Sequence, residues 1–103
     1  MSKLSYRPRA LADLDFIYDI IAPDSPERAF AYVDDIRARC RETLLAHPLL
    51  GPSRPDLGDG VRIYPIGNKR VVVAYRVAGD EIVILRVFYG GADYAAIMHD
   101  GDD

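Results

Sequence analysis

The chain has 103 residues, half of them hydrophobic, and a formal net charge of -3. This length suits one compact domain and is too short for two independent cores. Asp100, Asp102 and Asp103 at the end of the chain carry three negative charges, so the rest of the chain is close to neutral. Composition therefore does not indicate nucleic-acid binding through bulk charge.

Cysteine usage and hydropathy point to a cytoplasmic protein. The single cysteine, Cys40, excludes an internal disulfide and fits a packed thiol in a reducing compartment. We see no signal-like N-terminal region and no apolar run of about 18 residues, so neither export nor a membrane span is predicted. His47 and His99 have no cysteine or histidine at ligand spacing, so we predict no metal site and no cofactor.

The first half of the chain predicts a short strand and a helix. Residues 4–6 suit a strand, and Pro8 suits the first turn of the helix that follows. Pro23 ends this helix by Ala22. Apolar side chains recur at steps of three and four residues and predict its buried face: Leu11, Leu14, Ile17, Tyr18 and Ile21.

A second helix begins at a capping signal. Ser25 suits the N-cap, Pro26 the first helical position and Glu27 the positive end of the helix dipole. The helix is expected to run to about Ala46. Its predicted apolar stripe consists of Ala29, Val33, Ile36, Cys40 and Leu44. The short link between the two helices predicts an antiparallel hairpin.

The second half predicts three strands, over residues 61–66, 70–77 and 81–89. The links between them are too short for a parallel crossover, so the strands are antiparallel neighbours. The fold class is therefore α+β, a helical hairpin on a small antiparallel sheet in the order β-α-α-β-β-β. Residues 1–98 form the single domain, and residues 99–103 are expected to form a mobile acidic tail.

Four sequence pieces stand out from the rest of the chain. The longest is the loop over residues 48–62, which has the pattern P-x-x-G-x-x-R-x-D-L-x-x-G-x-R. The others are Ala12-Asp13-Leu14 with Ile17, Ala74-Tyr75-Arg76-Val77, and Ile84-Leu85-Arg86-Val87. In this order they resemble the ParE branch of the RelE/ParE toxin superfamily. The likeness covers nearly the whole chain and implies the β-α-α-β-β-β fold of that superfamily.

The resemblance implies a non-enzymatic toxin of a type II toxin-antitoxin system, of the kind also known as plasmid stabilisation proteins. Its implied partner is a small, ParD-like antitoxin whose C-terminal segment wraps the toxin in a hetero-oligomer. The implied target is DNA gyrase. Promoter DNA would be reached only indirectly, through the antitoxin.

The sibling branch, resembling RelE, cuts messenger RNA on the ribosome and supplies the alternative function. That reaction needs a proton acceptor, a cation for the phosphorane charge and an acid for the leaving oxygen. The positions that are basic in those nucleases hold Val72, Tyr64 and Gly90-Gly91-Ala92 here, and only Arg62 keeps a charge. A ribonuclease would have to use Arg62 with Tyr89 or His99.

The loop after the last strand also departs from the ParE pattern. Tyr89 stands where many ParE members have a histidine, and Gly90-Gly91-Ala92 lacks the arginines that follow it there. A third alternative is therefore a decayed toxin that only binds its antitoxin.

Candidate contacts for the antitoxin or the target lie in the second half of the chain. Arg86 is inside an apolar strand, which predicts an ion pair with Asp13 or Asp93. For Arg62 a partner contact and a local ion pair with Asp56 or Asp59 both remain open. The full candidate set is Arg62, Tyr75, Arg86, Tyr89, Gly91, Asp93 and Tyr94.

Overall fold

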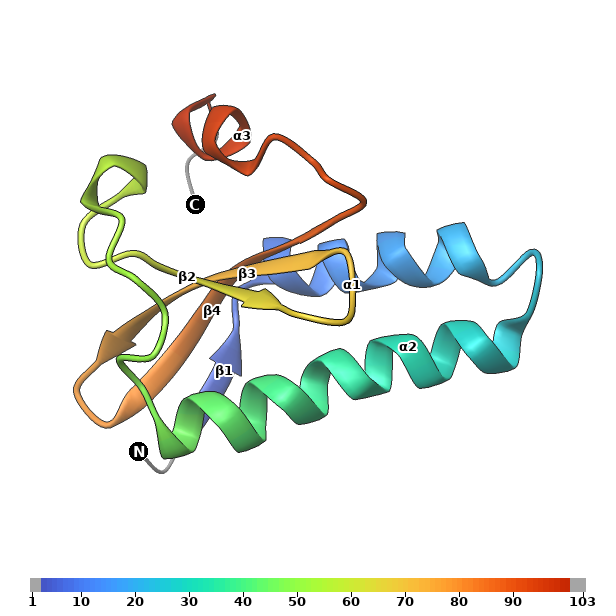
Figure 1. Ribbon diagram of the computed structural model, residues 1–103, viewed down its shortest axis with the longest axis horizontal. Coiled ribbons are helices and arrows are strands. Elements are labelled where there is room, and N and C mark those ends of the chain that lie inside the picture. Colours follow the sequence, from blue (N-terminus) through green and yellow to red (C-terminus); the bar gives the residue numbers. More distant parts are fainter. Residues whose placement is uncertain (1–2, 101–103) are drawn as a thin grey trace.

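The computed structural model describes residues 3–100 and forms an α+β fold (Figure 1). Its elements in chain order are β1 (Lys3–Tyr6), α1 (Pro8–Ile21), α2 (Pro26–Arg39), the π-helical turn η1 (Cys40–Leu44), the 3-10 turn η2 (Pro55–Leu57), β2 (Arg62–Ile66), β3 (Val71–Ala78), β4 (Glu81–Tyr89) and α3 (Tyr94–Asp100). The predicted fold class is confirmed, and so is the predicted order β-α-α-β-β-β, which corresponds to β1, α1, α2, β2, β3 and β4.

The sheet is mixed, with strand order β1-β4-β3-β2. Strands β2, β3 and β4 form the predicted antiparallel meander. The expectation of a wholly antiparallel sheet is wrong for β1, which pairs with β4 in parallel, from Lys3 opposite Glu81 to Tyr6 opposite Ile84. A parallel pair needs a long connection between its strands, and here the helical hairpin and two strands of the meander supply it.

The helix signals act as expected. Pro8 begins α1, and the Ser25 hydroxyl accepts a hydrogen bond from the backbone N–H of Arg28 at 3.1 Å, which caps α2. After Arg39 the helical path continues through η1, a turn widened to π geometry, and reaches Ala46. The connected ends of α1 and α2 extend beyond the sheet (Figure 1).

The helical hairpin covers one face of the sheet and buries the helix-side core. This core contains Ala10, Leu14, Ile17, Ile36, Cys40, Leu44, Ile66, Val71, Val73, Tyr75, Ile82, Ile84 and Val87. Leu11 was expected in the buried face of α1, but it is 44% exposed. Ala10, Leu14 and Ile17 form the centre of that face, and Leu11 lies about 100° around the helix from Ala10, on its flank.

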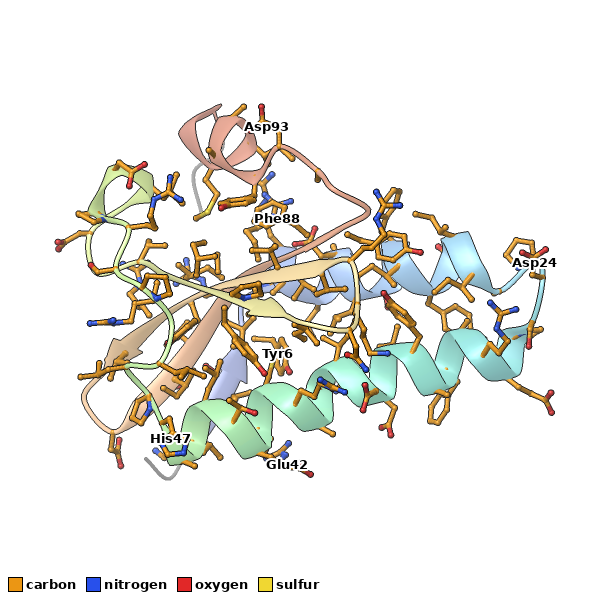
Figure 2. The ribbon with its side chains drawn as sticks, in the orientation of Figure 1. Tyr6, Asp24, Glu42, His47, Phe88 and Asp93 are labelled. Carbon is orange, nitrogen blue, oxygen red and sulfur yellow. The ribbon has the colours of Figure 1, made fainter. Side chains whose placement is uncertain are left out.

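The opposite face of the sheet carries a second, loop-side core of Leu57, Val61, Ile63, Ala74, Leu85 and Phe88. Helix α3 and the segment around η2 cover it, and Phe88 lies on the face turned toward α3 (Figure 2). The sequence did not predict α3. His99 and Asp100, expected in a mobile tail, are the last residues of this helix, and the remainder of that tail, residues 101–103, lies outside the described residues.

Candidate functional site

Tyr75 is a structural residue. Its side chain is fully buried, its hydroxyl donates a hydrogen bond to the Pro48 carbonyl at 2.8 Å, and it accepts one from the Gly51 N–H at 3.0 Å. Burial raises the pKa of this hydroxyl, so it stays protonated and able to donate. Tyr75 was a candidate for direct partner contact, and in this fold it instead holds the loop between α2 and β2 against the sheet.

We expect Tyr75→Phe to destabilise the protein by about 2 kcal/mol, because it leaves a buried N–H and a partly buried carbonyl without their partner. The variant keeps the ring and therefore the packing. Urea unfolding followed by circular dichroism measures the change. Tyr64→Phe is the matched control, since Tyr64 is only partly buried and packs at the margin of the core. Equal stability of the two variants would show that the hydroxyl does not anchor the loop.

Arg62 supports the same loop. Its Nη1 donates hydrogen bonds to the carbonyls of Gly51 at 2.7 Å and Leu49 at 3.3 Å. The sequence left open a partner contact or a local ion pair with Asp56 or Asp59 for Arg62, and the Asp56 carboxylate instead accepts two hydrogen bonds of 2.9 Å from Arg54. Two backbone carbonyls are therefore the partners of Arg62.

Arg86 forms the predicted ion pair with Asp13. The Asp13 carboxylate accepts from Arg86 Nε at 2.8 Å and Nη2 at 3.0 Å, and also from the backbone N–H of Val87 at 2.8 Å. Strand β1 pairs with β4 only as far as Ile84. Beyond that point the backbone N–H of Val87 has no partner strand on this side, and it donates to Asp13 of α1 instead. The side chains of Arg86 and Asp13 are 12% and 17% exposed, so this pair joins α1 to the sheet in a largely dry environment.

The last loop places the remaining candidates apart from one another. Tyr89 is half-buried and packs edge-on against Tyr32 of α2, with ring centroids 5.8 Å apart. Asp93 is exposed, and its carboxylate accepts from the Ala96 N–H at 3.2 Å, which caps α3 (Figure 2). Tyr94 packs against Phe88 of the loop-side core. Of Tyr89, Asp93 and Tyr94, only Asp93 is exposed.

Sequence reasoning missed a cluster at the end of the β2–β3 hairpin. Lys69 Nζ lies 4.1 Å from the centre of the Tyr32 ring and 3.3 Å from the Asp35 carboxylate. The guanidinium of Arg70 donates from Nη2 to the Gly90 carbonyl at 3.0 Å. No motif marks these residues, because turn, helix and loop meet only in the fold. Burial raises the pKa of Tyr32, and the nearby Tyr89 acts in the same direction.

Of the residue pairs in the ribonuclease alternative, Arg62 and Tyr89 are not brought together, and the side chain of His99 lies outside the described part of the structure. Arg62 lies opposite Tyr75, whereas Tyr89 lies opposite Val71. These two positions on β3 are four residues apart, which is about 13 Å along a strand. Val72, at a position that is basic in the nucleases, packs against the loop-side core. Arg62 and Tyr89 are therefore too far apart along the sheet to act on a single phosphate.

Six large apolar side chains are exposed among the residues that the structure describes. They are Leu11 (44%), Phe16 (61%), Ile20 (45%), Phe30 (66%), Leu49 (63%) and Leu50 (53%). Four of them lie on the helical hairpin, and the other two lie in the loop that Arg62 and Tyr75 hold. Phe16 and Ile20 are four residues apart and therefore neighbours on one face of α1, and exposed apolar neighbours of this kind are a candidate surface for a partner.

Residues 3–100 give no support for a reactive thiol, a metal site or a membrane-spanning helix. Cys40 is buried, and burial raises the pKa of its thiol to about 11, so it is protonated at neutral pH. The described residues contain no group of three or more His, Cys, Asp or Glu side chains that could hold a metal ion. No helix in this range is both long and apolar enough to cross a membrane.

Known proteins are similar to this chain over most of its length. The family described as "ParE toxin of type II toxin-antitoxin system, parDE" matches residues 4–94. Toxin ParE3 of Caulobacter vibrioides (strain ATCC 19089 / CIP 103742 / CB 15) is 34% identical over 85 residues, 82% of each chain. A solved structure titled "Chromosomal ParDE TA system from P. aeruginosa" superposes with a TM-score of 0.72 at 34% identity, covering 86% of this chain and 96% of that chain.

The helical hairpin over a meander sheet, extended by a parallel first strand, is thus the fold of a small toxin from a toxin-antitoxin system. The family match spans both cores and every candidate residue from Arg62 to Tyr94. The chain belongs to the ParE toxin family of type II toxin-antitoxin systems.

Proposed function

We propose that this toxin acts in the cytoplasm by binding and inhibiting DNA gyrase, without catalysing a reaction of its own. The family supports a toxin, and the state of the sheet supports a non-catalytic one. The observation that carries the second point is the use of Arg62, the one retained cation, on the carbonyls of Gly51 and Leu49. An arginine that supports a loop is poorly placed to stabilise a phosphorane.

The same proposal includes a small, ParD-like antitoxin that covers the exposed apolar side chains in a hetero-oligomer. The solved ParDE relative is a toxin-antitoxin system by its title. On this chain Phe16 and Phe30 lie on the hairpin and are more exposed than buried. An amphipathic helix in a groove, or an extended segment added to a sheet edge, is the form of partner that such surfaces fit. Promoter DNA enters this scheme only through the antitoxin.

A gyrase supercoiling assay with the purified toxin, run with and without the antitoxin, tests the proposal. We expect inhibition of supercoiling or trapped DNA cleavage, reversed when the antitoxin is added in excess. Messenger RNA on translating ribosomes is assayed in parallel and is expected to stay intact. Codon-positioned cuts that disappear in Arg62→Ala would replace the proposal with the ribonuclease. A folded protein that binds antitoxin and affects neither gyrase nor RNA would be a decayed toxin.

A further inference from the structure

An arginine from the β2–β3 turn is seated on the loop that follows β4. The backbone of Arg70 accepts a hydrogen bond from the Gly90 N–H at 2.8 Å, and its guanidinium Nη2 donates to the Gly90 carbonyl at 3.0 Å. The same Nη2 lies 3.1 Å from the point that a Cβ on Gly91 would occupy, and the backbone of Gly91 has φ +77°. Both features favour glycine at 91. Gly91 therefore leaves room for the guanidinium of Arg70.

Side-chain contacts hold together the segments next to Arg70. Tyr32 of α2 packs against Tyr89, the residue before the loop, and also lies under the ammonium group of Lys69. Lys69 is bound to Asp35, and its side chain is only 13% exposed. These contacts tie the turn, the loop and α2 together. The exposed guanidinium of Arg70 is consequently held in position before any partner arrives, which lowers the entropy lost on binding.

The chemistry of this position selects a carboxylate. Within the described residues the guanidinium makes one hydrogen bond, to Gly90, so most of its five N–H groups face solvent. The neighbouring cation, Lys69, is largely covered and already paired with Asp35. A nucleic-acid site needs several phosphate contacts from several cations. A single fixed guanidinium instead suits a bidentate pair with one carboxylate on a protein.

We propose that Arg70, fixed on the Gly90–Gly91 loop, is a target-contact residue that binds a carboxylate side chain on DNA gyrase. The inference rests on the proposed function and names the cation through which the toxin engages its target. The target rather than the antitoxin is the partner, because Arg70 is hydrogen-bonded to the loop after β4 and lies outside the helical hairpin, whereas four of the six exposed apolar side chains expected under the antitoxin lie on the hairpin.

Supercoiling inhibition by Arg70→Ala and Arg70→Glu, compared with the unmodified toxin, tests this assignment. We expect the concentration for half-inhibition to rise about tenfold in Arg70→Ala, the loss typical of one charge-assisted hydrogen-bonded pair. Arg70→Glu is expected to lose more, because two carboxylates then face each other, and the defect of Arg70→Ala should shrink as salt is raised. Arg28→Glu, an equal charge change at an exposed site near the start of α2, should inhibit like the unmodified toxin.

Each result has one meaning. Equal inhibition by the unmodified toxin and Arg70→Ala overturns the role of Arg70 and leaves the gyrase proposal standing. Equal losses in Arg70→Ala and Arg70→Glu with unchanged salt dependence also overturn the role of Arg70 as a target contact, because they indicate that Arg70 only holds the loop.

A loss of antitoxin affinity without any loss of gyrase inhibition assigns the carboxylate to the antitoxin and overturns the target assignment. An unmodified toxin that does not inhibit gyrase removes the proposed function and this inference together. Thermal unfolding verifies that both variants are folded.

Discussion

Asp13→Ala is expected to be the most destabilising single change among the polar residues of this protein. It removes three acceptor contacts at once, two from the Arg86 guanidinium and one from the Val87 N–H. Because both charged side chains are more than four-fifths buried, the guanidinium would lose this carboxylate without gaining full hydration. Breaking one partner of such a pair costs about 3 kcal/mol or more. We expect the thermal midpoint to fall by more than about 10 °C.

Calorimetry or circular dichroism at neutral pH measures this shift. Asp15→Ala is the matched control, because Asp15 lies on the same helix in an exposed position and its loss changes the net charge equally. The control is expected to unfold close to the unmodified protein. If both variants lost the same stability, helix charge rather than the contact between α1 and β4 would be responsible.

Local signals in the sequence predicted the helices and meander strands, because each depends on residues a few positions apart. Pro8 at a first helical turn and Ser25 at an N-cap act through their own backbone neighbourhood. The pair between Arg86 and Asp13 was also within reach of the sequence, since a cation inside an apolar strand requires a carboxylate. Which of the two candidate carboxylates it uses depends on how α1 lies against β4, and only the fold supplies that.

The missed features depend on contacts between segments that are distant along the chain. Strand β1 pairs with the side of β4 that faces away from β3. This parallel pairing joins segments that are as far apart in the sequence as Lys3 and Glu81. Helix α3 is short, and it is held by packing of Tyr94, Ala95, Ile97 and Met98 against the loop-side core rather than by strong helix signals of its own.

The roles of the candidate residues also depend on contacts between segments that are distant along the chain. Tyr75 and Arg62 were among the candidate partner contacts, and a local ion pair was also left open for Arg62. The fold instead brings the loop over residues 48–51 within reach of both side chains. Arg70 was predicted only as the first residue of the strand over residues 70–77, and the position of Gly90 gives it a role. The sequence consequently identified the family better than it identified the residues that contact a partner.

Two exposed phenylalanines of the helical hairpin, Phe16 and Phe30, should be needed for antitoxin binding and dispensable for folding. Phe16 and Phe30 are 61% and 66% exposed, so neither contributes much to the core. We expect the double variant Phe16→Ala/Phe30→Ala to unfold like the unmodified toxin, since alanine also favours a helix. Its antitoxin affinity should fall by about 100-fold or more, because buried aromatic anchors dominate such interfaces. Calorimetric titration with the purified antitoxin measures this loss.

The matched control, Phe16→Leu/Phe30→Leu, keeps most of the apolar area at the same two positions and should lose much less affinity. Gyrase inhibition separates the two surfaces of the toxin. If the antitoxin covers the hairpin while the loop after β4 engages the target, the double alanine variant should inhibit gyrase fully and escape neutralisation by the antitoxin. Unchanged antitoxin affinity in that variant would exclude the two phenylalanines from the interface and move it to Leu49 and Leu50, the exposed pair in the loop before β2. A joint loss of gyrase inhibition and antitoxin binding, in a protein that still folds, would mean that both partners compete for the same face of the hairpin.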